Sequence, residues 1–388
     1  MKYDFDKVVD RRGTGAIKWD VKENELPMWV ADMDFEAAPA IKEALAKRVE
    51  HGIFGYAECP DSWYQAYIDF YAEEHGLAIS KDSLLFCLGV VPTLSSSVRA
   101  LTEVGHEVVV MPPVYNIFYN SIRNSHRVIV EVPLRKEDDR YSMDYEGLEK
   151  AFASPRCKLC FFCNPGNPVA RIWEKQEIAR LIDIASKNGV TILSDEIHGE
   201  ITRPGHPYVP FLSVPGSEKV GYAAVSPTKC FNLAGIHTSA IIIPDEGIRA
   251  KVNRQINTDE VAEPNVFSCV AAEAALSKGR EWLRQMREYV FANRDYAESY
   301  INSHIKGLHA LPGEATYLMW IDCRKISDKS ATFLKFLREN TGLFLNDGGV
   351  YGKTGDGFIR MNLATTRANV EDGLRRLEEG VRLFLLNR

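Results

Sequence analysis

The sequence predicts an α/β protein with a mostly parallel sheet, helices on both faces of that sheet, and a smaller α+β domain beside it. Three observations support this prediction. Between about residues 85 and 245, short apolar runs alternate with segments of helical spacing, which is typical of parallel strands joined by helices. The pattern changes after about residue 278. The length of 388 residues also exceeds what one hydrophobic core usually serves.

Six apolar runs in the first region predict buried strands, at residues 107–111, 127–132, 158–163, 190–194, 221–225 and 239–243. The segments between them have helical spacing. In the segment from Glu174 to Asn188, apolar residues recur at steps of three and four until Gly189 ends the pattern.

The second region predicts a long helix at about residues 278–301, strands at 317–322 and 357–364, and helices at 330–340 and 369–386. We therefore expect a large domain over residues 49–285 and a small one over 286–388. Residues 1–48 show no strand pattern, and we expect them to pack on the small domain or on a partner subunit.

Composition excludes several classes of protein. The chain has 47 Lys and Arg against 53 Asp and Glu, so its net charge is −6. This acidic excess argues against binding to nucleic acid or to an anionic membrane. No apolar run approaches the roughly 20 residues of a membrane helix. The first residues are charged and lack the apolar core of a secretory signal, so we expect a cytoplasmic protein.

Familiar catalytic and metal motifs are missing or lack their context. Cys160 and Cys163 form a C-x-x-C, but residues three apart on a strand point to opposite faces and cannot share a metal. Gly352-Lys353-Thr354 resembles the end of a phosphate loop, yet Asp347 stands where its first glycine belongs. Neither H-E-x-x-H nor G-x-S-x-G occurs. We expect no metal site.

Polar residues follow three of the predicted strands. Asn167 follows the strand at 158–163, Asp195 the strand at 190–194, and Lys229 the strand at 221–225. Because parallel strands end at one edge of a sheet, these side chains are expected to meet there. Gly89 and the residues after it open a helix whose free N–H groups suit an anion.

This combination suits pyridoxal 5′-phosphate. That cofactor needs a lysine amine for a Schiff base, a carboxylate opposite its pyridine nitrogen, and a phosphate cradle. Taken singly, Asp195 is as easily a helix cap, Asn167 a turn residue, Lys229 a surface amine and Gly89 a tight-turn residue. Their joint occurrence at successive strand ends favours the cofactor.

Several stretches together resemble one family. They are residues 26–35 with Trp-Val-Ala-Asp-Met-Asp-Phe, Gly-Val-Val-Pro at 89–92, Pro-Val-Tyr at 113–115, Ser-Asp-Glu-Ile-His at 194–198, residues 226–235 with Ser-Pro-Thr-Lys, and residues 357–362. The sequence resembles fold-type I pyridoxal-phosphate enzymes of the aminotransferase class I/II family, and within it the MalY/PatB group of cystathionine β-lyases. Trp-Val-Ala-Asp-Met-Asp-Phe is the most specific stretch for this group.

The resemblance implies roles for the residues around the cofactor. Lys229 binds the cofactor covalently and moves protons at Cα of the substrate, and Asp195 pairs with the pyridine nitrogen. Asn167 and His198 lie near the ring oxygen, where related enzymes have a tyrosine in place of His198. The ring is expected to stack on a tyrosine and the phosphate to meet backbone groups and a hydroxyl, which the resemblance assigns to Tyr115, Gly89, Val90, Val91 and Ser226.

Two further residues are assigned to the substrate and the subunit contact. Arg360 is expected to clamp the α-carboxylate of an amino acid, for which guanidinium geometry is well suited. Tyr56 resembles a tyrosine that reaches the cofactor and substrate of a second subunit, so the resemblance implies a homodimer with shared sites.

The sequence departs from the family pattern at two places near the site. The family usually has Asn-Pro-x-Gly, whereas Val169 and Ala170 follow Asn167-Pro168 here. Alanine disfavours the positive φ open to glycine, so the turn is expected to differ. The family often has proline after the stacking tyrosine, where this chain has Asn116, and the change is expected to affect selectivity for the substrate side chain.

Three activities remain open at this stage. The subgroup resemblance favours β-elimination of sulfur amino acids such as L-cystathionine, giving pyruvate, ammonia and a thiol. Amino transfer uses the same first steps and is the alternative. A third possibility is a regulatory protein that holds the cofactor and acts through a protein partner, as some members of the subgroup are thought to do.

Overall fold

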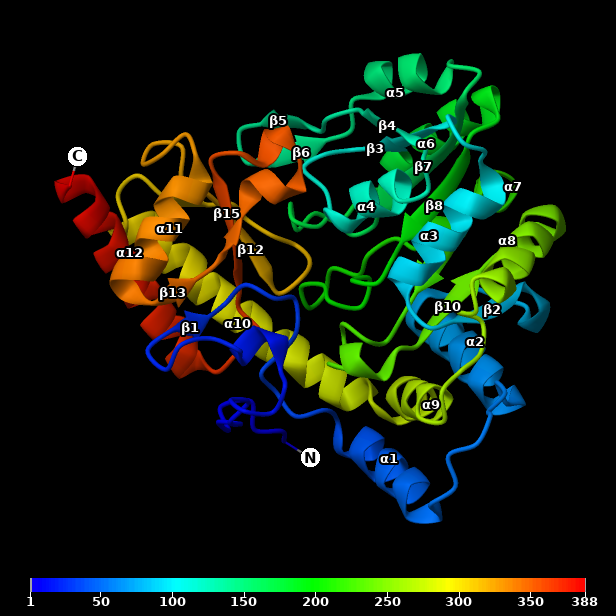
Figure 1. The fold of residues 1–388 in the computed structure, drawn as a ribbon, viewed down its shortest axis with the longest axis horizontal. Coiled ribbons are helices and arrows are strands. Elements are labelled where there is room, and N and C mark those ends of the chain that lie inside the picture. Colours follow the sequence, from blue (N-terminus) through cyan, green and yellow to red (C-terminus); the bar gives the residue numbers. More distant parts are fainter. Residues whose placement is uncertain (1, 388) are drawn as a thin grey trace.

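The computed structural model describes residues 2–387, and its centre is a seven-stranded sheet within those residues (Figure 1). The strand order is β2-β10-β9-β8-β7-β3-β4. Their bounds are Leu84–Cys87 for β2, Glu107–Val110 for β3, Val128–Glu131 for β4, Cys157–Cys163 for β7, Thr191–Asp195 for β8, Gly221–Val225 for β9 and Ser239–Ile242 for β10. All neighbouring pairs are parallel except those made by β10. The prediction of a mostly parallel sheet is confirmed.

Helices cover both faces of this sheet. Cys160 and Phe162 of β7 face one side, where they pack with α5 (Tyr145–Phe152) and α6 (Lys175–Asn188). Leu159 and Phe161 face the other, against α3 (Val90–Leu101), α4 (Ile117–Arg123) and α8 (Glu246–Thr258). Cys163 lies in this second cluster, so Cys160 and Cys163 point to opposite faces as predicted.

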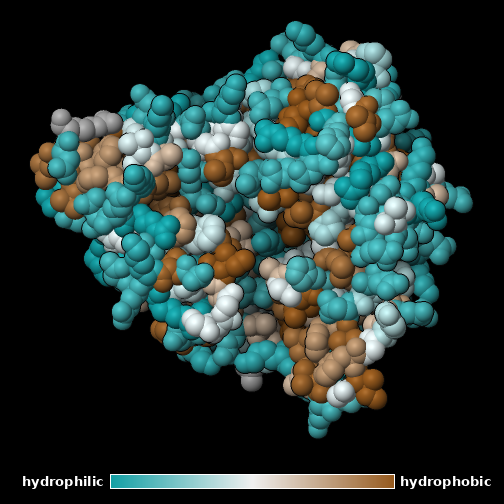
Figure 2. Space-filling model, viewed as in Figure 1, coloured by the Kyte–Doolittle hydropathy of each residue, from teal (hydrophilic) through white to brown (hydrophobic). Residues whose placement is uncertain are grey.

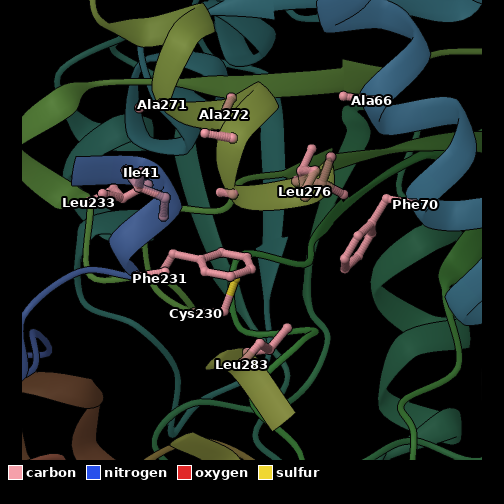
Figure 3. Packing of buried hydrophobic residues seen from close by; sticks show 14 of the residues in the cluster. Ile41, Ala66, Phe70, Cys230, Phe231, Leu233, Ala271, Ala272, Leu276 and Leu283 are labelled. Atoms are coloured by element: carbon pink, nitrogen blue, oxygen red, sulfur yellow. The ribbon is translucent and has the colours of Figure 1, made fainter. Parts of the chain in front are cut away.

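A third apolar cluster fixes the segment that follows β9. It joins α1 (Pro39–His51), α2 (Asp61–His75), α9 (Ser268–Lys278) and the first half of α10 (Arg280–His304). Cys230 and Phe231 reach into this cluster, where Figure 3 shows them among residues of α1, α9 and α10. The backbone on both sides of Lys229 is thereby held by the strand before it and the core after it.

The small sheet lies on the C-terminal half of the chain, in the order β11-β12-β15-β14. Its elements are β11 (His309–Ala310), β12 (Leu318–Asp322), β14 (Asn346–Asp347) and β15 (Phe358–Asn362), covered by α11 (Ser330–Thr341) and α12 (Arg367–Leu386). A separate hairpin forms from β5 (Arg135–Glu137) and β6 (Arg140–Ser142). Helix α10 contributes to the cores of both regions.

The N-terminal residues do contain a strand, contrary to the expectation from the sequence. Residues Leu26–Pro27 form β1, which pairs in parallel with β13 (Leu343–Phe344). Two residues are too short for an alternation pattern to be detectable. Leu26 and Met28 pack in the apolar cluster beneath the small sheet. Among the helices of residues 2–387, none combines the length and the hydrophobicity that a bilayer crossing requires.

Candidate active site

A cavity of about 380 Å³ opens at the carboxyl ends of the parallel strands. Eight of the residues predicted from the sequence line it: Gly89, Val90, Val91, Tyr115, Asn167, Asp195, His198 and Lys229. Because they come from strand ends and from the start of α3, the sheet itself brings them together.

Lys229 is a buried amine held at the wall of the cavity. Its Nζ donates a hydrogen bond to the carbonyl of Ala31 at 2.7 Å. Burial, and then the positive charge of Arg360, lower the pKa of Lys229 to about 8. A substantial fraction of this amine is therefore neutral near pH 7 to 8, the form that attacks a carbonyl carbon or accepts a proton.

Asp195 is the last residue of β8 and is 4% exposed. Burial raises its pKa to about 6, while a hydrogen bond from the N–H of Ile197 to Oδ1, at 3.1 Å, acts in the opposite direction. The carboxyl group is thus mostly ionised at neutral pH, although its environment penalises the charge. A cationic ring nitrogen placed beside it relieves that penalty.

Arg360 is a buried cation without an ion pair among residues 2–387. Its Nη1 donates to Oδ1 of Asn167 at 3.2 Å and its Nη2 to the carbonyl of Trp29 at 3.1 Å, and the guanidinium lies 4.9 Å from the ring centroid of Tyr351. Its Nε has no hydrogen-bond partner within the described chain. A buried guanidinium held by neutral groups is a receptor for a carboxylate.

His198 and Tyr115 lie on the cavity wall in their neutral forms. Burial and the charges of Lys229 and Arg360 hold the pKa of His198 well below its usual value. The Nδ1 of His198 has no partner among residues 2–387. Burial raises the pKa of Tyr115 to about 12. The orphaned imidazole nitrogen is a polar atom that a ligand in the cavity would satisfy.

Three of the four residues predicted to meet the phosphate lie together at one end of the cavity. Gly89 precedes α3, and Val90 and Val91 begin it, so their N–H groups are free for an anion. Ser226 is not among the lining residues, because its hydroxyl bonds to Thr228 Oγ1 and to the carbonyl of Thr238.

Several lining residues were not assigned to the site from the sequence, among them Thr228, His237 and Thr238. The Oγ1 of Thr238 is buried without a hydrogen-bond partner in the described chain. Thr238 precedes β10, and β10 runs antiparallel to β9, so the start of β10 meets the carboxyl ends of the other strands. A sequence prediction that β10 runs antiparallel to its neighbours would have placed Thr238 at this edge of the sheet.

Residues 29–34, called the strap here, pass beside the cavity, and Ala31 is one of its lining residues. The strap presents carbonyl groups to the site. The carbonyl of Trp29 accepts from Arg360 and Asn346, and that of Ala31 from Lys229 and, at 3.0 Å, from the hydroxyl of Tyr317. The carbonyls of Val30 and Asp32 both accept from the amide of Asn362.

A buried charge cluster anchors the strap. Asp34 accepts hydrogen bonds from Arg11 Nη1 at 2.8 Å, Lys18 Nζ at 2.9 Å and Trp19 Nε1 at 2.8 Å. Burial alone raises the pKa of Asp34, but the charge of Lys18 and these hydrogen bonds outweigh it and hold the pKa below its usual value. Lys18 is itself fully buried, so the pair is a permanent part of the fold.

The two departures from the family pattern have clear structural outcomes. Ala170 adopts a φ of 54°, the left-handed conformation usual for glycine, so alanine does not prevent that conformation in this turn. Its carbonyl accepts hydrogen bonds from the N–H groups of Glu314 and Ala315, which hold it there. Asn116 precedes α4 with a φ of −62°, close to the value that proline imposes.

Tyr56 lies outside the cavity of its own chain. It belongs to residues 52–60, between α1 and α2, and its side chain is completely exposed. Its assignment to the site of a second subunit therefore stays a prediction.

A mostly parallel sheet with a lysine, an aspartate and an asparagine at its carboxyl edge, and a buried arginine beside them, defines the class of aminotransferase-fold enzymes. The sequence model for aminotransferase class I and II matches residues 24–377, and the chain belongs to that family, as predicted.

The similarities extend along nearly the whole chain. Cystathionine beta-lyase PatB of Bacillus subtilis is 37% identical over 382 residues, which are 96% of this chain and 98% of PatB. Protein MalY of Escherichia coli is 31% identical over 98% of this chain and 99% of MalY. The crystal structure of cystalysin from Treponema denticola, which contains pyridoxal 5′-phosphate, superposes with a TM-score of 0.95 at 29% identity, covering 98% of this chain and 99% of cystalysin.

Proposed function

We propose that this protein is a pyridoxal-phosphate-dependent carbon–sulfur lyase that releases pyruvate, ammonia and a thiol from cysteine-derived amino acids such as L-cystathionine. The observation that carries the proposal is the placement of Lys229, Asp195 and Arg360 around one buried cavity. The high identity to a cystathionine β-lyase over almost the whole length supports the choice of leaving group.

The residues of the cavity fit the cofactor. Lys229 supplies an amine of lowered pKa, Asp195 a buried carboxylate, and the start of α3 an anion cradle. The unpartnered atoms of His198 and Thr238 offer two further hydrogen-bonding positions. When bound, pyridoxal phosphate supplies an electron sink that stores the electron pair of the Cα–H bond until sulfur leaves Cβ.

The remaining chemistry falls to side chains of this protein. Arg360 receives the α-carboxylate of the substrate, with Asn167 beside it to hold the guanidinium. Lys229 Nζ then takes the proton from Cα, because its lowered pKa makes the neutral amine available near neutral pH. The strap and the burial of the site limit the access of water, which strengthens these electrostatic contacts.

We further propose that two copies of the chain form a homodimer and that Tyr56 enters the partner's site. Figure 2 shows hydrophobic residues at the lower part of this face, over α1 and the segment after it. Val49, Ile53 and Phe54 are each more than half exposed there, beside the fully exposed Tyr56. Exposed apolar side chains gathered at one place mark an interaction surface, and the location of Tyr56 favours a second copy as its occupant.

The direct test is an assay of pyruvate and thiol release from cystathionine, cystine and S-alkylcysteines, run beside an amino-transfer assay with a keto acid acceptor. Lyase activity predicts pyruvate and thiol in equal amounts. Amino transfer without pyruvate from cystathionine would contradict the proposal and favour the aminotransferase alternative. A regulatory function that survives Lys229→Ala while neither activity is found would favour the third alternative.

The dimer is tested by mixing two inactive variants. Tyr56→Ala and Lys229→Ala chains, combined as verified heterodimers, place one intact site in each mixed dimer if sites are shared. Recovered activity supports the shared site, and its absence argues for sites formed within one chain.

A further inference from the structure

One backbone carbonyl in the wall of the cavity accepts hydrogen bonds from two side chains. The carbonyl oxygen of Ala31 accepts from Nζ of Lys229 at 2.7 Å and from the hydroxyl of Tyr317 at 3.0 Å. Lys229 follows β9 of the large sheet, whereas Tyr317 directly precedes β12 of the small sheet. Two parts of the chain that are distant in sequence therefore meet on one oxygen atom beside the reactive amine.

The shared carbonyl is held in place by contacts of its neighbours. The amide of Asn362 donates to the carbonyls of Val30 and Asp32, the two residues that flank Ala31. The backbone of the strap is thus fixed on both sides of the shared carbonyl. Loss of one donor at Ala31 is therefore expected to change the hydrogen bonding of this carbonyl and to leave its position nearly unchanged.

The backbone that carries Tyr317 is held with unusual force. Thr316 has a φ of 61°, which is rare and unfavourable for a β-branched residue. Arg294 of α10 is fully buried, and its Nη1 donates to the carbonyls of Thr316 at 3.4 Å and of Leu318 at 3.1 Å. A Cβ at Gly313 would lie 1.8 Å from Nη2 of Arg294, so this packing requires glycine there. A strained residue and a buried cation together fix the backbone on both sides of Tyr317.

The side chain of Tyr317 is a permanent hydrogen-bond donor. Tyr317 is fully buried, and its ring packs edge-on against the imidazole of His198, with 6.2 Å between ring centroids and 76° between ring planes. Burial raises the pKa of Tyr317 well above its usual value, so the hydroxyl keeps its proton. The fixed backbone and ring leave this proton directed at the carbonyl of Ala31.

We infer that Tyr317 is a positioning residue for Lys229, and that its hydroxyl competes with the Lys229 ammonium for the carbonyl of Ala31. A carbonyl oxygen that already accepts one hydrogen bond is a weaker acceptor for a second donor. The charged ammonium loses more by this competition than the neutral amine does, because hydrogen bonds from charged donors are stronger. Tyr317 thus favours the neutral amine. The inference rests on the proposed function only for what that amine then does, which is to take the proton from Cα.

Charged groups on three other elements also act on Lys229. Burial, and then Arg360 of β15, lower the pKa of Lys229, whereas Asp32 of the strap and Asp195 of β8 raise it. His198 is held neutral and adds no charge. Removal of one buried hydroxyl leaves all of these charges in place. A changed pKa of Lys229 in a variant that lacks only this hydroxyl therefore reports the shared carbonyl.

The pKa of Lys229 is measured on the cofactor-free full-length chain by competitive labelling with trace acetic anhydride over a range of pH. Lys229 lines the cavity and is reached by a small reagent, and the exposed Lys251 is the internal reference. The parent protein is expected to give a pKa of about 8. In Tyr317→Phe we expect a value higher by about 0.5 to 1, because one neutral hydrogen bond contributes about this much to a protonation equilibrium.

Two further variants sharpen the measurement. Tyr141→Phe removes another buried hydroxyl, which accepts from Nε1 of Trp320 at 3.2 Å and does not line the cavity, so the pKa of Lys229 should stay unchanged. Incorporation of 3-fluorotyrosine at position 317 keeps the ring and makes the hydroxyl a stronger donor, so the pKa of Lys229 should fall. An unchanged or lowered pKa in Tyr317→Phe would overturn the inference, as would an unchanged or raised pKa with 3-fluorotyrosine.

The enzyme loaded with cofactor gives a second readout. An increase of about 0.5 to 1 in the pKa of Lys229 lowers the neutral fraction about 3- to 10-fold near pH 7 and hardly changes it near pH 10. We expect kcat/KM of Tyr317→Phe to fall by this factor near neutral pH and to approach the parent value at high pH. An equal loss at every pH would show a merely structural role and would overturn the inference. Labelling needs neither cofactor nor turnover, so failure of the lyase proposal and failure of the shared carbonyl are separate results.

Discussion

The cavity is enclosed by two regions of different construction. The sheet edge supplies reactive side chains, Asn167, Asp195 and Lys229, each placed by the end of a strand. The strap supplies backbone carbonyls, and its position depends on the buried ion pair between its last residue, Asp34, and Lys18. Substitutions at the sheet edge thus remove chemical groups, whereas substitutions under the strap displace groups that remain present.

This difference predicts that substitutions in the two regions affect activity and stability differently. Sheet-edge variants are expected to fold normally and lose activity, because these groups add little to the packing of the core. Strap variants are expected to lose stability together with only part of the activity, because a buried ion pair is broken while the reactive groups persist.

Lys229→Ala is expected to have the largest effect. It removes both the covalent attachment point and the proton acceptor at Cα, and we expect turnover to fall by at least about 10⁴-fold. Pyruvate release measures turnover, and borohydride trapping on the peptide that contains residue 229 measures attachment. The exposed Lys251 provides the control as Lys251→Ala. Retained trapping at another lysine in the variant would contradict the assignment.

Asp195→Asn is expected to lower turnover by about 10²- to 10³-fold, because the amide carries no charge to hold a protonated ring nitrogen. It should also stabilise the cofactor-free protein at neutral pH. Burial raises the pKa of Asp195 from 3.8 to about 6, so the charged carboxylate opposes folding above that range by up to roughly 3 kcal/mol.

The pH dependence of the free energy of unfolding follows from the raised pKa of Asp195. The folded state binds the proton of Asp195 more tightly than the unfolded state, so the penalty is absent below about pH 4 and complete above about pH 6. Melting curves of cofactor-free parent and Asp195→Asn proteins should therefore converge at low pH and separate at neutral pH. A constant difference across this range would show that the carboxyl group is not the cause.

Arg360→Lys separates the substrate contact from the cofactor contact. An ammonium cannot reproduce the planar pair of donors, and we expect KM for the amino acid to rise about 10- to 100-fold. Affinity for the cofactor, measured by titration of the cofactor-free protein, should change little. Equal losses of substrate and cofactor affinity would contradict the role of Arg360 as the carboxylate receptor.

The sequence predicted the sheet edge well for a physical reason. Strands such as β9 are buried on both faces, which gives them continuous apolar runs, and polar residues directly after such runs fall at the ligand edge. The bounds of β9 agree with the prediction residue by residue. Strand β2 was missed, because its apolar run continues through Leu88 toward the start of α3, and such a run does not separate a strand from a buried helix.

The strap was invisible to sequence reasoning for an equally physical reason. The Trp-Val-Ala-Asp-Met-Asp-Phe stretch carried the family resemblance, but its contacts to Lys229 and Arg360 use carbonyl oxygens, which every residue possesses. Only the folded chain shows which carbonyls face the site. Asp34 likewise has an ordinary residue type, and its role appears only through contacts with Arg11 and Lys18.

Asp34→Asn tests the strap. Replacing Asp34 removes the carboxylate 2.9 Å from the buried Lys18 and leaves it only the more distant carboxylate of Asp32, at 3.7 Å. We expect a loss of about 3 kcal/mol in the free energy of unfolding. We expect kcat/KM of the folded fraction to fall about tenfold, with a shift in the pH profile as the carbonyl of Ala31 moves from Lys229. Glu36→Gln removes exposed ion pairs with Lys7 and Lys42 and is the matched control. Reduced stability with unchanged kinetics would limit Asp34 to a structural role.

Asn116→Pro is expected to have the smallest effect and restores the residue that the family often carries. The φ of −62° at Asn116 already matches proline, so the substitution restricts the unfolded chain without straining the fold. We expect a gain of about 0.5 kcal/mol in stability and an unchanged Tyr115. In Asn120→Pro, proline enters the middle of α4, where it removes the backbone N–H of residue 120 and its ring clashes with the carbonyl of Asn116, and a loss of about 3 kcal/mol is expected. Urea unfolding measures both changes. Similar losses of stability in the two variants would show that Asn116 stabilises the turn after Tyr115 through its side chain or its N–H as well as through its φ. A change in KM with Asn116→Pro alone would assign the Asn116 side chain to substrate selectivity.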